Sequence, residues 1–63
     1  MEKHELKEFI IHRLNDPLVF QLEGNPFFIG RPTAVDDDVV SVTEQGYLTY
    51  VNIRKIVSVA TIG

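Results

Sequence analysis

Few side chains in this sequence are placed to do covalent chemistry or to hold a metal ion. His4 and His12 lie about two turns apart on a predicted helix, too far for the i, i+4 pairing that brings two imidazoles to one metal. No general base lies near Ser41, Ser58 or any threonine in the sequence, and there is no cysteine for a thiolate site. We therefore predict a protein that is not an enzyme, with no catalytic residue, no cofactor and no bound metal.

Three consecutive carboxylates, Asp36, Asp37 and Asp38, form a strong local cluster of charge. Oxygen ligands suit Mg²⁺ or Ca²⁺, so a cation site is one interpretation of the run. The other is a solvated polar turn in which Asp36 bonds to local backbone amides. We favour the turn, because runs of this kind between two apolar segments commonly reverse the chain.

Length and composition indicate one small folded domain over residues 1–63. Hydrophobic residues make up 44% of the chain and charged residues 24%, which are globular values. A chain this short buries only about 60% of its surface, and without disulfides self-association becomes the favoured way to stabilise it. The net charge of -3 argues against a broad basic face, so any nucleic-acid binding must be local and directed at the bases.

The sequence contains no apolar run of the roughly 18 residues that a membrane-spanning helix needs. The N-terminus is charged where a secretory signal would have an apolar stretch. We therefore expect no membrane association and a cytoplasmic location.

The first segment with a clear period is predicted to be a helix over about residues 2–14. Its apolar residues recur at helical spacing, namely Leu6, Phe9, Ile10 and Leu14. Residues 15–17 then supply turn chemistry, because Pro17 disfavours helical angles at the residue before it. The helix is expected to end there.

The rest of the chain, about residues 18–62, is predicted to form a small β-barrel. Strand-like patterns cover residues 18–22, 27–35, 39–42, 47–51 and 55–61. Turn residues separate them, and Gly30 and Pro32 mark a bend or bulge in the second strand. The expected fold is mostly β: five short antiparallel strands, strongly bent, behind an N-terminal helix.

The last predicted strand has apolar residues on both of its faces, namely Ile56, Val57, Val59 and Ile62. A strand that faces water on one side would alternate instead. One face is therefore expected to fill the barrel and the other to meet a neighbouring copy. Pairing edge to edge into a closed ring would satisfy both exposed edges of the sheet.

Two short motifs follow one another in this order of elements. The first consists of a turn glycine, a strand glycine and a hydrophobic-Asp-x-x-hydrophobic pattern, namely Leu22-Glu23-Gly24, Gly30, Ala34-Val35-Asp36 and Val39-Val40. The second is the run from Tyr50 to Ile56, in which Tyr50 and the Ile53-Arg54 pair fit best. Over nearly the whole chain this arrangement resembles the Sm and Sm-like (LSM) family, in particular its bacterial RNA-binding host-factor branch, Hfq.

The resemblance implies a Sm-like (SH3-like) barrel that assembles with itself into a ring of about five to seven subunits, with a hexamer favoured. It also implies binding of single-stranded RNA. Tyr50 with Asn52 would form a base pocket, the tyrosine stacking and the amide reading a base edge. Tyr50 packed at a subunit interface is the competing interpretation.

On the opposite ring face, the resemblance suggests a second RNA site built from Phe20, Asn25 and Phe28. A plain core role for Phe20 and Phe28 is the alternative. Lys7, His12 and Arg13 are either phosphate contacts along the rim or a solvated helical face.

The sequence departs from the Hfq pattern at the uridine pocket. Asp37 and Asp38 stand where that branch has a glutamine and a stacking phenylalanine, and Val51 and Asn52 stand where it has lysine and histidine. Extra carboxylates repel phosphates. Two hypotheses therefore remain: a ring that binds single-stranded RNA, and a scaffold or protein-interaction ring that does not.

Overall fold

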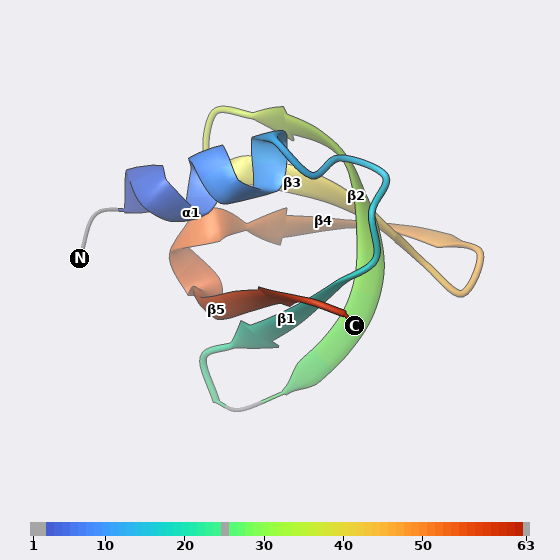
Figure 1. The fold of residues 1–63 in the computed structure, drawn as a ribbon. Coiled ribbons are helices and arrows are strands. Elements are labelled where there is room, and N and C mark those ends of the chain that lie inside the picture. Colours follow the sequence, from blue (N-terminus) through green and yellow to red (C-terminus); the bar gives the residue numbers. More distant parts are fainter. Residues whose placement is uncertain (1–2, 25, 63) are drawn as a thin grey trace.

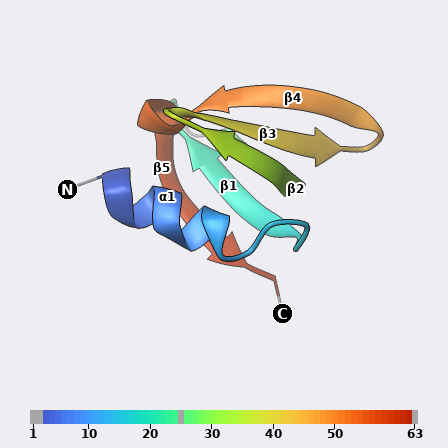
Figure 2. The same ribbon diagram turned by 90° about the horizontal axis from the view of Figure 1, so that it is seen from above.

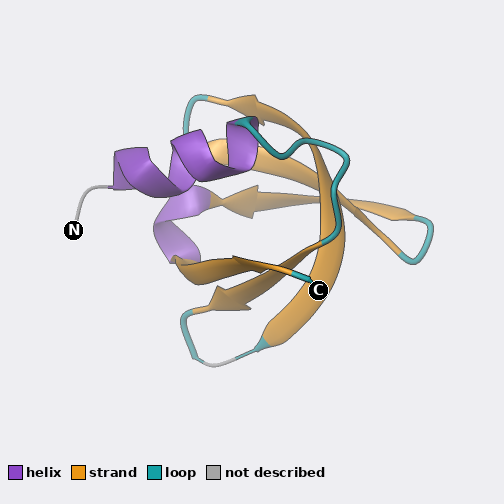
Figure 3. Ribbon diagram, viewed as in Figure 1, coloured by secondary structure: helices purple, strands orange, loops and turns teal. Residues whose placement is uncertain are grey.

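The computed structural model describes residues 3–24 and 26–62. The fold is mostly β, as predicted, with a helix in front of five strands (Figures 1 and 3). In chain order the elements are α1 (Lys3–Ile11), β1 (Leu18–Leu22), β2 (Phe27–Asp36), β3 (Val39–Glu44), β4 (Tyr47–Asn52), the 3-10 helix η1 (Ile53–Lys55) and β5 (Ile56–Thr61). Every predicted strand is present, and the boundaries of four of them shift by one or two residues.

The strands form one antiparallel sheet in the order β4-β3-β2-β1-β5. The long strand β2 belongs to both halves of this sheet, since its first half pairs with β1 and its second half with β3. Figure 1 shows β2 curving around the molecule between them. The strands β4 and β5 are the two edges of the sheet, and no ladder joins them within the described residues.

A close approach between two strands explains why β2 needs glycine where it bends. Gly30 is buried, and a Cβ atom placed there would lie 2.4 Å from Cγ1 of Val42 and 3.0 Å from the carbonyl oxygen of Thr43. The register with β3 then shifts between Pro32 and Ala34, as at a bulge. The predicted bend is therefore confirmed.

The core lies inside the bent sheet and is covered by α1. Its fully or nearly buried members are Ile10, Leu18, Phe20, Val40, Val42, Val51, Ile53 and Ile56. Figures 1 and 2 show α1 lying across one end of the strands. Ile10 is the residue through which the helix enters the core, and Leu6, Phe9 and Leu14 pack around it.

The helix ends three residues earlier than expected, at Ile11. The backbone N–H of Arg13 bonds to the carbonyl of Ile10, a tighter turn than the α-helical one, and Asn15 has a positive φ of 71°. Asn15 is held in this conformation because its N–H donates to the carbonyl of Pro32 at 2.7 Å. Contact with the bent strand β2 therefore ends the helix before Pro17 does.

The turns carry the residues that their backbone angles require. Gly24 has φ +85°, a conformation that strains any side chain, so the turn glycine of the first motif has a backbone reason. Gln45 and Gly46 both have positive φ, which suits the tight β3–β4 hairpin. Among the described residues, no helix is long and apolar enough to cross a membrane.

Candidate functional site

The two motifs that the sequence singled out meet at one end of the sheet. Asp38, in the β2–β3 turn, accepts a 2.7 Å hydrogen bond at its carbonyl oxygen from the backbone N–H of Ile53. Its carboxylate lies 3.5 Å from Nε of Arg54. Both side chains of this ion pair are well exposed, so the backbone bond contributes more to joining the loops than the charges do.

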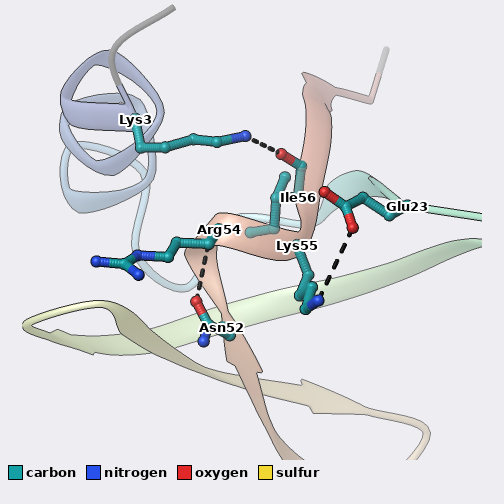
Figure 4. A network of polar contacts seen from close by, with 6 residues as sticks. All are labelled: Lys3, Glu23, Asn52, Arg54, Lys55 and Ile56. Atoms are coloured by element: carbon teal, nitrogen blue, oxygen red, sulfur yellow. Dashed lines mark hydrogen bonds and ion pairs between the residues drawn. The ribbon is translucent and has the colours of Figure 1, made fainter.

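Asn52 forms the start of the second loop. Its side-chain oxygen accepts a 2.9 Å hydrogen bond from the backbone N–H of Arg54, which caps η1 (Figure 4). Asn52 is itself exposed, and its backbone is still extended, with φ -76° and ψ 123°. It therefore continues the alternation of β4 while it shapes the turn that follows.

Tyr50 presents its ring on the outer side of the sheet. It is 68% exposed and lies opposite Ser41 on β3. Because alternate residues of a strand share a face, Tyr50 and Asn52 point the same way and Val51 points to the core, where it is 7% exposed. The structure thus brings together the two residues predicted to form a base pocket. Val51 does not occupy a position from which a side chain could face a ligand.

Cations from the helix surround the joined loops, a feature that sequence reasoning missed. Lys3, His4 and Lys7 line a shallow pocket of about 220 Å³ together with Asp38 and Ile53. Nζ of Lys3 donates a 2.8 Å hydrogen bond to the carbonyl of Ile56, which ties the helix to β5 (Figure 4). The i, i+4 spacing of Lys3 and Lys7 was a visible signal, but their proximity to the loops depends on how the helix docks.

The other basic residues of the helix turn back on it. Nδ1 of His12 lies 2.9 Å from the carbonyl oxygen of Glu8. The guanidinium of Arg13 donates to the carbonyl of Phe9 and lies 3.8 Å from the centre of its ring. Of the three rim candidates named from the sequence, only Lys7 lines the pocket beside the loops.

The acidic turn does not gather its carboxylates around one point. Asp36 is exposed at the end of β2, Asp37 takes a positive φ of 57° in the turn, and Asp38 pairs with Arg54. Within residues 3–24 and 26–62, no three histidine or acidic side chains are grouped to hold a metal ion. Asp36 is a strand-end residue, paired across the ladder with Val39.

The structure gives Phe20 and Phe28 the core role that was one of their two interpretations. Phe20 is fully buried, and its ring stacks on Phe28 with the centroids 5.0 Å apart. On the outer face of the same sheet lie Phe27 and Ile29, which are 66% and 56% exposed. Asn25, the third residue proposed for this face, lies outside the described residues, and Gly24 beside it serves the turn.

A second shallow pocket of about 310 Å³ lies where β2 bends. Its lining residues are Pro17, Ile29, Gly30, Arg31, Thr43, Glu44, Gln45 and Gly46. Two of its polar side chains bond within the fold: the Arg31 guanidinium donates to the carbonyl of Asn15, and the Thr43 hydroxyl donates to the carbonyl of Arg31. These groups hold the bend together.

Comparison with known proteins does not place the chain in a family. No family model matches the sequence, and no curated protein and no solved structure matches it. What can be said of function therefore depends on the exposed Tyr50 and Asn52, the joined loops and the free sheet edges.

Proposed function

We propose that this chain is the subunit of a Sm-like ring of about five to seven identical copies, six favoured, that binds single-stranded RNA in the cytoplasm. The bent sheet would be the wall of a Sm-like barrel. The observation that carries the proposal is the exposed ring of Tyr50, on the same strand face as Asn52 and next to the joined loops. The role is one of binding, without a catalytic step.

The two free edges of the sheet support assembly. Edge strands carry unpaired backbone N–H and C=O groups that readily pair with another strand. Both edges here also carry exposed apolar side chains: Tyr47, Leu48 and Tyr50 on β4, and Val57 on β5 with Ile62 just after it. If β4 of one copy pairs with β5 of the next, the contact repeats head to tail and closes into a ring.

The chemistry around Tyr50 supports RNA as the ligand. An exposed aromatic ring contributes about 1–3 kcal/mol when a base stacks on it. Arg54 and Lys7 place positive charge near the same loops, where it opposes the repulsion of phosphates by the acidic turn. A ring would repeat such a site in every subunit, so that weak single contacts add up through multivalency.

The matched pair Tyr50→Ala and Tyr47→Ala tests this assignment. Both tyrosines lie on β4 and both are largely exposed, but they lie on opposite faces of the strand. We expect Tyr50→Ala to weaken binding of short single-stranded RNA about fivefold or more, with the mass of the assembly unchanged. Tyr47→Ala should leave RNA affinity within about twofold of wild type. Loss of assembly in Tyr50→Ala would instead assign that residue to the subunit interface.

A scaffold ring without RNA binding is the second candidate, and two observations favour it. Asp36 and Asp37 lie exposed beside the loops and would repel phosphates. Phe27 and Ile29 form an exposed apolar surface on the outer face of the sheet, a kind of surface that commonly binds other proteins. If the assembled wild-type protein binds no single-stranded RNA at physiological salt, this second function replaces the first.

A further inference from the structure

The carboxamide of Asn52 has a defined orientation. A backbone N–H can only donate, so the side-chain atom that faces the N–H of Arg54 at 2.9 Å must be the oxygen. The nitrogen is attached to the same planar carbon at about 120° from that oxygen, and in Figure 4 it points away from the Arg54 backbone. Asn52 is thus held with its acceptor engaged in the fold and its two N–H donors directed outward.

This donor group lies beside the stacking surface. Tyr50 and Asn52 are separated by one residue on an extended strand, so their side chains leave the same face about 7 Å apart. A base stacked on the Tyr50 ring can direct its edge toward Asn52. The amide of Asn52 is then the group closest to that edge in the sequence of the strand.

An asparagine whose acceptor is engaged recognises a different set of bases from a free one. A free carboxamide pairs with adenine through both atoms, accepting from the amino group and donating to a ring nitrogen. With the oxygen bonded to Arg54, Asn52 can only donate, and the amino group of adenine can only donate in return. Uracil, guanine and cytosine each carry an exocyclic carbonyl oxygen that accepts, and adenine is the one standard RNA base without it.

We propose that Asn52 acts as a donor-only reader, which selects RNA bases with an exocyclic carbonyl oxygen and disfavours adenine. The proposal depends on the RNA-binding function proposed above and names its specificity-determining residue. Because one neutral hydrogen bond is gained or lost at each base, the preference should be about threefold to tenfold at a single site.

Adenine and hypoxanthine form the appropriate pair of probes. They share the purine rings that stack, but hypoxanthine has a carbonyl oxygen where adenine has its amino group. We would measure the binding of six-nucleotide oligoadenosine and oligoinosine, short enough to remain single-stranded, to the assembled protein by fluorescence anisotropy at one fixed salt concentration. The wild-type protein should bind oligoinosine at least threefold more tightly.

The variant Asn52→Asp separates the two tasks of the side chain. Aspartate keeps a carboxyl oxygen to cap η1 but has no N–H to donate. Its extra charge should weaken both RNAs, so the ratio of the two affinities is the quantity to compare. We expect that ratio to fall to about one, with a thermal unfolding midpoint close to that of the wild type.

Each outcome decides between the inference and the function on which it depends. Equal binding of the two RNAs by the wild type, or tighter binding of oligoadenosine, would overturn the role of Asn52 and leave the RNA-binding function standing. A preference that persists in Asn52→Asp would also overturn it. Binding of neither RNA would overturn both proposals together.

Discussion

The backbone N–H of Ile53 donates a 2.7 Å hydrogen bond to the carbonyl oxygen of Asp38, and this bond joins two loops that flank the β3–β4 hairpin. Ile53 is almost fully buried, so the bond is protected from water, whereas the ion pair between Asp38 and Arg54 beside it is exposed. The hydrogen bond fixes where Asn52 begins the turn. The position of the proposed RNA site is therefore set by backbone contacts more than by charge.

The ion pair between Asp38 and Arg54 should consequently contribute little to stability. In a double-mutant cycle with Asp38→Asn and Arg54→Met, we expect a coupling free energy of at most about 0.5 kcal/mol. It should vanish in 1 M salt, where exposed charges are screened. Urea unfolding at one protein concentration measures it. A coupling above about 1 kcal/mol that resists salt would show that the charges hold the loops together.

Substitution of two neighbouring aromatic positions should have very different effects on the free energy of unfolding. Phe20→Ala removes a fully buried ring from the stack with Phe28 and should cost about 3–5 kcal/mol. Phe27→Ala removes a ring that is 66% exposed and should cost less than about 1 kcal/mol. Phe20→Leu, which keeps most of the volume, provides a folded intermediate case. Equal losses at Phe20 and Phe27 would contradict the assignment of the core.

Gly30→Ala should destabilise the fold because its new methyl group meets the Val42 side chain where β2 bends. Overpacking of this kind costs about 1–3 kcal/mol. Val42→Ala removes Cγ1, the atom nearest to the new methyl, so the double variant should lose less than the sum of the two single losses. Denaturant unfolding of the four proteins in this cycle gives the answer. Strict additivity would mean that the close approach is not what makes glycine necessary.

Assembly should depend on the edge strands and not on the middle of the sheet. Val57 on the edge strand β5 and Ile29 on the central strand β2 are exposed to a similar extent, 54% and 56%. Val57→Lys should shift the protein toward monomers at micromolar concentration, because it places a charge in the proposed interface. Ile29→Lys introduces the same charge and should leave the assembly intact. Sedimentation velocity of both variants distinguishes the edge from the outer face.

The sequence contained enough information to locate the strands but not to say which phenylalanine faces inward. Gly24, Pro17 and the β3–β4 turn residues have strong local preferences, and period-two alternation places β1 and β4 within a residue or two. Phe27 and Phe28 are adjacent, however, and alternation alone allows either to be buried. The choice is made by the tight contact of Gly30 with Val42 and the stack of Phe28 on Phe20, both of which are tertiary.

The candidate site was predictable in part for the same reason. Tyr50 and Asn52 are two apart in a strand, so their shared face follows from the sequence once the strand is placed. The end of the helix was misjudged because Asn15 bonds to Pro32, a residue distant in the chain. The docking of Lys3 onto the carbonyl of Ile56 depends equally on the folded structure, so the cations near the loops could not be foreseen.

Native mass spectrometry of the purified protein, alone and with a short single-stranded RNA that contains uracil, tests the central claim most directly. It should be recorded with a salt series, because RNA affinity depends on ionic strength. We predict a single closed species of about five to seven subunits, with six favoured, that takes up one RNA per ring. A monomer that stays monomeric at micromolar concentration would contradict the assembly, and a ring that takes up no RNA would contradict the proposed function.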